Sequence, residues 1–355
     1  MRATDYNYNL PREQIAQFPL EERKLCKLMV LNSKSREILH SRFDSLKSYL
    51  IPGDLLVINN SKVLPAKLHL FRDKTLGKIV ALLVSKESQK EDIWRALLSK
   101  RKGTTPGTIL LTEKKEIRVL IKSTIGEEFI IEFIDSRGKI TSESLFEIGM
   151  APLPPYIKRN MKNAEIDFKN KDKIDYQTIY AKFDGSIAAP TAGMHFTPDL
   201  IQELEDFGVE FVQITHHIGK GTFKPIKTTN IEDHAMDKEY YEIDSHAAEQ
   251  INKAKLSGRR VITVGTSSTR ALESSCMDLK RGLIEPKTAW TGLFITDGYN
   301  YKVIDGMITN FHLPKSTNLV MVCVFGGREY ILKAYKEAVE NNYRFYSYGD
   351  AMLLI

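Results

Sequence analysis

Two histidine-bearing turns near the middle of the chain carry residue types suited to proton transfer. His195 ends the small-residue stretch 188–193, where a ligand can approach the backbone closely. His217 follows a predicted strand at residues 209–214 and precedes the glycine loop 219–222. Imidazole can be neutral at pH 7 and still accept a proton, so both turns are candidate catalytic positions. Tight loops that hold core histidines are the alternative.

A third turn could bind an anion. The predicted strand at residues 261–264 is followed by Gly265 and Thr266, and then by a helix that carries Arg270. Free amide groups at a helix start attract negative charge, and the guanidinium adds to the attraction. The absence of a Gly-x-Gly-x-x-Gly motif argues against a dinucleotide site, and an ordinary strand-to-helix turn remains the alternative.

A fourth polar stretch, residues 307–317, lies near the carboxyl end. It contains Asn310 and His312, and its final Lys315-Ser316-Thr317 is similar to the end of a nucleotide-binding P-loop. Pro314 stands where that loop requires glycine, which argues against ATP binding.

The composition is that of a globular protein large enough for two domains. The chain has 355 residues, and 42% hydrophobic with 27% charged residues argues against disorder. A net charge of +6 permits a polyanionic partner without requiring one. Cys26, Cys276 and Cys323 are widely separated, so the sequence predicts neither a disulfide framework nor a thiolate zinc site. The eight histidines show no metal-binding spacing either.

The sequence gives no sign of membrane attachment. Residues 1–11 lack the apolar region of a signal peptide. The longest apolar run, residues 319–325, is too short to cross a bilayer. We therefore expect a cytoplasmic protein.

The elements that must position these turns change in character along the chain. Residues 67–149 consist of short β-rich runs separated by glycine and proline, which predicts a small barrel or sandwich. Elsewhere short apolar runs at residues 28–31 and 55–58 predict buried strands, and such runs alternate with helical patterns. Thr197 would cap one of the helices and Gly208 would end it, and Ser245 would cap another. The proline-rich segment 151–156 suits re-entry from one domain into another.

Several long motifs, in the same order, resemble those of one enzyme family. They include PGDLLVINNSKV from Pro52, AAPTAGMHF from Ala188, HIGKGTFKP from His217, VGTSSTRALES from Val264 and ITNFHLPKST from Ile308. Over essentially its whole length the chain is similar to the S-adenosylmethionine:tRNA ribosyltransferase-isomerases, the QueA family of queuosine biosynthesis. The resemblance implies an α/β main domain with an inserted small β-barrel domain. Residues 1–66 and 150–355 would form the discontinuous main domain, and residues 67–149 the insertion.

The resemblance also implies a specific reaction. Such enzymes move the ribosyl carbons of S-adenosylmethionine onto the 7-aminomethyl-7-deazaguanine at the tRNA wobble position, and epoxyqueuosine, adenine and methionine result. A base must remove a proton beside the sulfonium, and an acid must assist adenine departure. S-adenosylmethionine is consumed as a co-substrate, so we expect no cofactor and no metal. A tRNA-binding protein of the same fold without catalysis is the alternative, and a missing Gly-x-Gly turn disfavours a general methyltransferase.

The turns and the resemblance together give the expected site residues. The expected catalytic residues are His195, His217, His312, Glu239 and Asp350. The expected S-adenosylmethionine and substrate contacts are Ala189, Pro190, Thr191, Gly193, Gly219, Gly221, Thr222, Gly265, Thr266, Arg270, Asn310 and Lys315. The expected tRNA contacts, which would bind phosphate, are Lys62, Lys100, Arg101, Lys102, Arg159 and Arg344.

These residues carry expected roles. We expect the three histidines to approach one another, with Glu239, Arg270 and Asp350 nearby. Either His195 or His217 would be the base, and Arg270 would bind the methionine carboxylate. We also expect a monomer.

Eight positions depart from the pattern of the family. Asn60, Ser61 and Lys62 stand where Asp, Thr and Arg are usual, and lysine lacks the bidentate binding of arginine. His216 replaces an aliphatic residue directly before His217. The remaining departures are Ala81, Asp237, Gly292 and Asp297.

Overall fold

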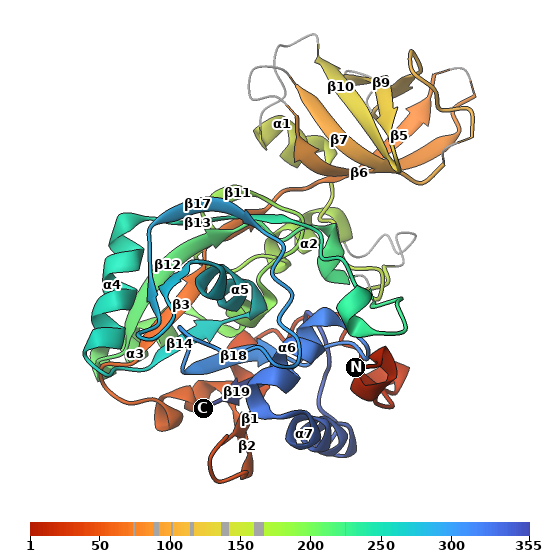
Figure 1. Ribbon diagram of the computed structural model, residues 1–355. Helices are drawn as coiled ribbons and strands as arrows, with labels where there is room; N and C mark the ends of the chain where they lie inside the picture. Colours follow the sequence, from red (N-terminus) through yellow and green to blue (C-terminus); the bar gives the residue numbers. More distant parts are fainter. Residues whose placement is uncertain are drawn as a thin grey trace.

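The computed structural model describes residues 1–73, 75–87, 92–100, 102–113, 117–135, 142–159, 167–223 and 225–355. Within them, a large mixed sheet with helices and a closed barrel form two separate bodies (Figure 1). The fold is an α/β main domain with an inserted small β-barrel, as predicted. No helix in these ranges is both long enough and apolar enough to cross a membrane.

The main domain is built on a nine-stranded sheet with the order β17-β13-β12-β3-β14-β18-β19-β1-β2. The strands span Lys27–Leu31 (β1), Ile38–Arg42 (β2), Leu55–Asn59 (β3), Glu210–His216 (β12), Glu239–Ile243 (β13), Val261–Val264 (β14), Lys287–Thr291 (β17), Gly306–Asn310 (β18) and Ala351–Leu354 (β19). The predicted strands at residues 28–31, 55–58, 209–214 and 261–264 are confirmed, with ends that move by two residues at most.

Four neighbouring strands in the middle of this sheet, β12, β3, β14 and β18, run parallel. Their carboxyl ends therefore meet at one edge, which is where open α/β sheets bind ligands. The segments that begin at Asn60, His217, Gly265 and Phe311 follow these four strands directly. The topology thus gathers three of the predicted polar turns at a single edge.

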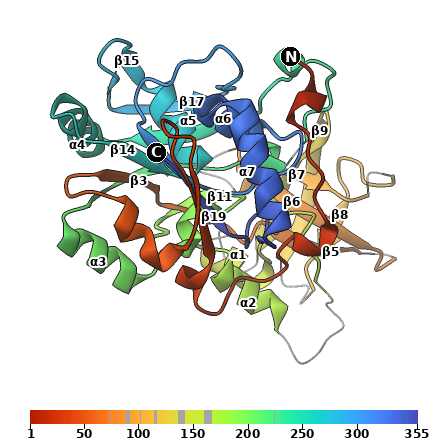
Figure 2. The same cartoon turned by 90° about the horizontal axis from the view of Figure 1, so that it is seen from below.

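Helices cover both faces of the sheet (Figures 1 and 2). Successive residues of a strand point to opposite faces, so Leu55 and Val57 pack on one side and Leu56 and Ile58 on the other. The first side is covered by α4 (Ser245–Leu256), α5 (Thr266–Ser274), α6 (Thr317–Gly326) and α7 (Arg328–Glu340). The second is covered by α3 (Pro198–Phe207) and the 3-10 helix at Phe43–Tyr49.

The ends of α3 are those that the sequence predicts. The Thr197 hydroxyl accepts a hydrogen bond from the amide of Leu200, and Gly208 ends the helix in the left-handed region with φ 99°. For α4 we expected Ser245 to be the capping residue, which is wrong. The carboxylate of Asp244, one residue earlier, accepts the amide of Ala247 at 2.7 Å.

The inserted barrel is closed by antiparallel strands in the order β10-β7-β6-β5-β8-β9. They span Lys67–Arg72 (β5), Lys78–Lys86 (β6), Ile93–Leu98 (β7), Ile109–Leu111 (β8), Ile117–Ile125 (β9) and Glu128–Asp135 (β10), and the helix α1 (Ser142–Ile148) follows. Lys67 and Met150 bond to each other through both backbone groups, at 3.2 and 2.8 Å. The chain therefore enters and leaves the barrel at one bridge.

Glu273 of α5 is a buried anchor for the loop before β18. Its side chain is 5% exposed and accepts hydrogen bonds from the backbone amides of Lys302, Val303 and Ile304 at 3.0 to 3.2 Å. The Tyr299 hydroxyl donates a further bond at 2.9 Å. One carboxylate thus holds a loop whose amides would otherwise be buried without acceptors.

We expect Glu273→Gln to lower the free energy of unfolding by about 2–4 kcal/mol, because the new amide would point N–H groups at N–H donors. Urea denaturation followed by circular dichroism measures this change. Glu340→Gln, at an exposed position of α7, is the control and should stay within about 0.5 kcal/mol. A Glu273 variant as stable as this control would contradict the anchoring role.

Candidate functional site

A cavity of about 960 Å³ lies between the barrel and the carboxyl edge of the main sheet; we call it the interdomain cavity. Trp94, Arg95 and Glu128 line it from the barrel, and His217, Glu239 and Trp290 line it from the main domain. Its volume is that of a typical small-molecule site. Lys220 of the main domain pairs with Glu128 of the barrel, so an ion pair crosses the wall of this cavity.

His217, which directly follows β12, lies in the wall of the interdomain cavity. Its ring stacks on Tyr240 with centroids 5.4 Å apart, and its Nδ1 has no hydrogen-bond partner in the described part of the chain. A Cβ atom at Gly185 would lie 2.7 Å from its Nε2, so the glycine makes room for the ring. Burial lowers the pKa of His217 to about 4, and the nearby His216 contributes. The ring is therefore neutral at pH 7 and able to accept a proton.

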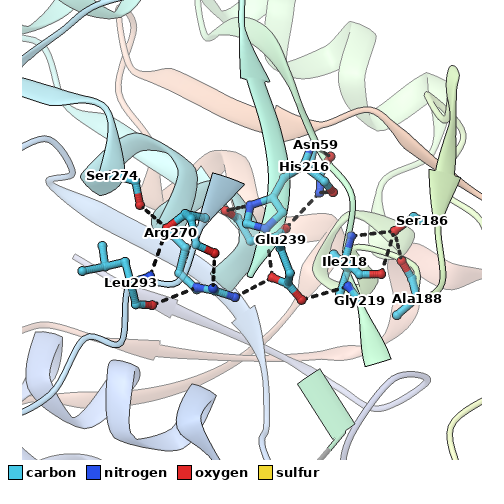
Figure 3. Close-up of polar contacts among 12 residues, drawn as sticks. Asn59, Ser186, Ala188, His216, Ile218, Gly219, Glu239, Arg270, Ser274 and Leu293 are labelled. Atoms are coloured by element: carbon cyan, nitrogen blue, oxygen red, sulfur yellow. Dashed lines mark hydrogen bonds and ion pairs between the residues drawn. The ribbon is translucent and has the colours of Figure 1, made fainter. Parts of the chain in front are cut away.

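Glu239, the first residue of β13, is 4% exposed and is surrounded by donors (Figure 3). Its Oε2 lies 2.9 Å from His216 Nε2 and pairs with the guanidinium of Arg270, and its Oε1 accepts the amide of Gly219 at 2.8 Å. Burial by itself raises the pKa of Glu239, but the hydrogen bond from His216 and the charge of Arg270 outweigh it and lower the pKa to about 2. Glu239 is thus a fixed carboxylate and not a neutral-pH proton donor.

Arg270 of α5 is an internal partner of this carboxylate. Its side chain is buried, and it also donates to the backbone carbonyls of Leu293 at 3.1 Å and Thr291 at 3.4 Å. Arg270 lines neither the interdomain cavity nor the smaller one described next. The expected contact with a methionine carboxylate is therefore not available here, because the guanidinium faces Glu239 and the chain itself.

A smaller cavity of about 80 Å³ lies beside the first one, and Ile218 lines both. Many of the expected substrate contacts surround it: Ala189, Pro190, Thr191, Gly265, Thr266 and Asn310. His312 is in the same wall, and its Nε2 lies 2.8 Å from the Thr309 hydroxyl. Burial lowers the pKa of His312 to about 3. Small side chains and a glycine turn thus form a tight pocket.

His195 lies apart from both cavities, beside a third one of about 20 Å³. Its Nε2 is 3.1 Å from Asn310 Nδ2, which also donates to the carbonyl of Tyr346, so the ring nitrogen is the acceptor. The proton then sits on Nδ1 and points at the sulfur of Cys26, 3.2 Å away. Burial is the main cause that lowers the pKa of His195 to about 3. Both ring nitrogens are engaged, and the three histidines are distributed over three cavities instead of one.

Asp350 ties the carboxyl-terminal segment to β1. Its two oxygens accept the backbone amides of Lys27 at 2.9 Å and Arg344 at 2.7 Å. Burial raises its pKa. It lines neither the interdomain nor the smaller cavity, so the structure does not place it beside His217 as we expected.

The remaining expected contacts shape the backbone. A Cβ at Gly193 would lie 1.9 Å from the hydroxyl of Tyr180, and one at Gly221 would lie 2.8 Å from the carboxylate of Asp237. Gly219 lines the interdomain cavity. Lys315 has φ 57°, and its backbone bonds to Tyr6 and Ile226. The side chain of Thr222 lies outside the described part of the structure.

Comparison with known proteins gives the site its context. The family model described as queuosine biosynthesis protein matches residues 3–354. The chain belongs to this family. It is 48% identical to the S-adenosylmethionine:tRNA ribosyltransferase-isomerase of Carboxydothermus hydrogenoformans and 44% identical to that of a Thermoanaerobacter species, each over 357 residues with full coverage of both chains.

A solved structure agrees with this membership. The S-adenosylmethionine tRNA ribosyltransferase of Thermotoga maritima is 30% identical, covers 99% of this chain and all of its own, and gives a TM-score of 0.53. In the described part of this queuosine biosynthesis protein, no three His, Cys, Asp or Glu side chains are grouped so that they could hold a metal ion.

Two of the basic residues expected to contact RNA are engaged by partners within the chain of this family member. Arg159 forms a buried pair with Asp172 and lies over the ring of Phe18 at 4.5 Å. Arg344 is partly buried and donates to the carbonyl of Phe18. In both cases the sequence showed a charge but not the group that the charge contacts.

The other expected RNA contacts lie on the surface where they are described. Lys62 is exposed and lies 3.5 Å from Asp184. Lys100 and Lys102 are exposed on a loop of the barrel. Arg101 lies outside the described residues.

Sequence reasoning noted His216 only as a departure from the family and did not assign Asn59 a function. The Asn59 side chain bonds both backbone groups of His216, at 2.9 and 3.0 Å, and its Nδ2 lies 3.0 Å from the Ser267 hydroxyl. Strand alternation was the available signal. It places His216 on the opposite side from His217, inside the sheet, where a ring must find polar partners.

Proposed function

We propose that the chain is an S-adenosylmethionine:tRNA ribosyltransferase-isomerase. It transfers and isomerises the ribosyl group of S-adenosylmethionine onto the aminomethyl-deazaguanine at the tRNA wobble position, and releases adenine and methionine. The observation that carries the proposal is the match along the whole chain to relatives of that name, one of them 48% identical. The alternative, a tRNA-binding protein without catalysis, has no observation in its favour.

The reaction is proposed to take place in the interdomain cavity. Its 960 Å³ can hold a drug-sized ligand, whereas the neighbouring 80 Å³ pocket can hold only part of one. Both tryptophans of the chain, Trp94 and Trp290, line the larger space, and Trp290, which is 62% exposed, offers a face on which a nucleobase can stack. The small-residue pocket would then take one end of S-adenosylmethionine through backbone groups.

His217 is the proposed base. A base must take the proton from the carbon beside the sulfonium, and only an unprotonated nitrogen can accept it. His217 alone among the three candidate histidines combines a neutral ring, a nitrogen without a partner in the described residues, and a position in the larger cavity. Glu239 remains ionised and acts through the loop that it holds.

The test is the release of adenine. The protein is incubated with S-adenosylmethionine and tRNA that carries the 7-aminomethyl-7-deazaguanine, and adenine is measured by chromatography. We expect adenine only when both substrates are present, with unmodified tRNA as the control. Binding of the modified tRNA without adenine release would support the alternative, and neither binding nor release would contradict both.

The proposed RNA surface includes the barrel loop with Lys100 and Lys102. Replacing both by Ala should weaken tRNA binding and reduce its dependence on salt, because fewer counterions are released. If the variant binds tRNA as the wild type does from low to high salt, these lysines are solvated surface residues without a role in RNA binding. The monomeric state and the cytoplasmic location that we expect belong to the same proposal, and sedimentation of the purified chain tests the first.

A further inference from the structure

His216 is completely buried, and each of its ring nitrogens faces an acceptor. Its exposed fraction is 0%. Nδ1 lies 2.9 Å from the backbone carbonyl oxygen of Ser267, and Nε2 lies 2.9 Å from Oε2 of Glu239. A carbonyl oxygen cannot donate, so Nδ1 must carry a proton.

The second ring nitrogen must carry a proton as well. Glu239 Oε2 also pairs with the guanidinium of Arg270, and Oε1 accepts the amide of Gly219 (Figure 3). A proton on this carboxyl group would oppose a permanent cation in a buried site, so the group is ionised and Nε2 has to donate. A neutral ring would leave a lone pair facing a carboxylate.

We infer that His216 is a charged imidazolium, and that with Arg270 it forms a two-cation clamp that positions the Glu239 carboxylate and, through it, the glycine loop beside His217. The inference rests on the proposed function for its kinetic meaning. His216 is a positioning residue, since it lines neither the interdomain nor the smaller cavity. Gly219, which the carboxylate holds, does line the interdomain cavity.

The clamp also sets the charge beside the proposed base. His216 and Arg270 against Glu239 leave one net positive charge next to His217, which disfavours a second positive charge there. Other titratable groups lie near these two histidines. Asp184 of β11 (Phe183–Ser186) acts on the pKa of His217 in the opposite direction. The ring of Tyr240 stacks on that of His217, and the ring of Tyr241, also on β13, lies 6.4 Å from that of His216. Without His216, both His217 and Glu239 would hold a proton more readily.

The first test needs no substrate. Protein labelled with ¹⁵N-histidine is studied by long-range ¹H–¹⁵N NMR at pH 7, and the spectrum of His216→Gln assigns the His216 signals. We expect two protonated ring nitrogens for His216. A pattern with one protonated and one bare nitrogen at this pH would overturn the inference.

The second test compares three variants in the same titration. His216→Leu removes the ring and its charge, and His216→Gln keeps a donor without the charge, so one of them can be used if the other does not fold. In both, the titration midpoint of His217 should rise by about one pH unit. Tyr241→Phe is the matched control, since it removes a hydroxyl from a buried ring near His216 but no charge. A His217 midpoint that stays unchanged in the His216 variants, or one that Gln restores to the wild-type value, would overturn the inference.

The kinetic consequence is measured separately. In the His216 variants the acid limb of the pH profile for adenine release should move to higher pH, whereas a merely structural loss would lower the rate equally at every pH. An equal loss at every pH would overturn the positioning role. If the wild-type protein releases no adenine, the proposed function fails, and the charged state of His216 is still decided by NMR.

Discussion

Replacing His217 by Asn should lower kcat/KM for adenine release by about 10²- to 10⁴-fold, the range expected when a general base is removed. The ring is neutral at pH 7 because burial lowers its pKa to about 4. Its Nδ1 has no partner in the described residues, so no other group there competes for the proton. Asn is smaller than His and does not press on Gly185, where space around the ring is tight.

Variants of the other two histidines serve as controls for this prediction. His312→Asn removes a ring of the smaller cavity, and His195→Asn removes a ring whose two nitrogens are already engaged. These variants should keep turnover within about tenfold and change mainly stability. Each rate is read beside the thermal midpoint of the same variant. A folded His217→Asn protein with near-normal turnover would exclude His217 as the base.

Mild acid should destabilise the protein steeply between pH 6.5 and 5. His195, His217 and His312 have native pKa values lowered to about 3, 4 and 3, whereas an unfolded histidine has a pKa near 6.5. Below pH 6.5 the unfolded chain therefore binds more protons than the native one. Each histidine's contribution is fully present above that pH and is lost as the pH falls toward its native pKa, by about 1.4 kcal/mol per pH unit.

Urea unfolding at pH 6.5, 6.0, 5.5 and 5.0 measures this slope. These three groups give about 4 kcal/mol per pH unit at most, and His69 on β5, whose pKa burial also lowers, adds to the slope. His312→Asn should reduce the slope by up to about 1.4 kcal/mol per pH unit, because one proton fewer is taken up. Glu239 does not interfere, since its pKa is lowered to about 2 and its own loss begins at lower pH. A slope that is flat over this range would show that the histidines become protonated in the native state.

Local pattern was enough to predict most elements that carry the site. The ends of α3 depend on Thr197 and Gly208, which lie next to the helix, and short apolar runs fixed β3 and β14 to within a residue. The position of the turns at one edge of the sheet follows from the parallel direction of their strands. What pattern could not supply was the partner of each charge. In the sequence, Arg270 and Arg159 look like cations that are free to bind a ligand. In the structure, each pairs with a carboxylate from another part of the chain, Glu239 and Asp172 respectively.

The histidines show the same limit. His195, His217 and His312 occupy similar turns in the sequence, yet burial and hydrogen bonds give them different states. Only the position of Asn310 determines that His195 accepts at Nε2, and this contact joins β18 to a turn far earlier in the chain. Alternation along β12 could have predicted that His216 and His217 point to opposite sides. It could not have predicted which groups His216 contacts.

The bridge between Lys67 and Met150 has a consequence for the order in which the chain is made. β3 leaves the ribosome before the barrel, but both of its sheet partners, β12 and β14, are encoded after it. Domains fold as units during synthesis, with amino-terminal ones first. All six barrel strands have therefore been synthesised while β3 still lacks its neighbours. The inserted barrel can thus fold before the main domain that surrounds it in the sequence. Once residues 210–264 emerge, the host sheet closes around β3, with the two ends of the barrel already held side by side.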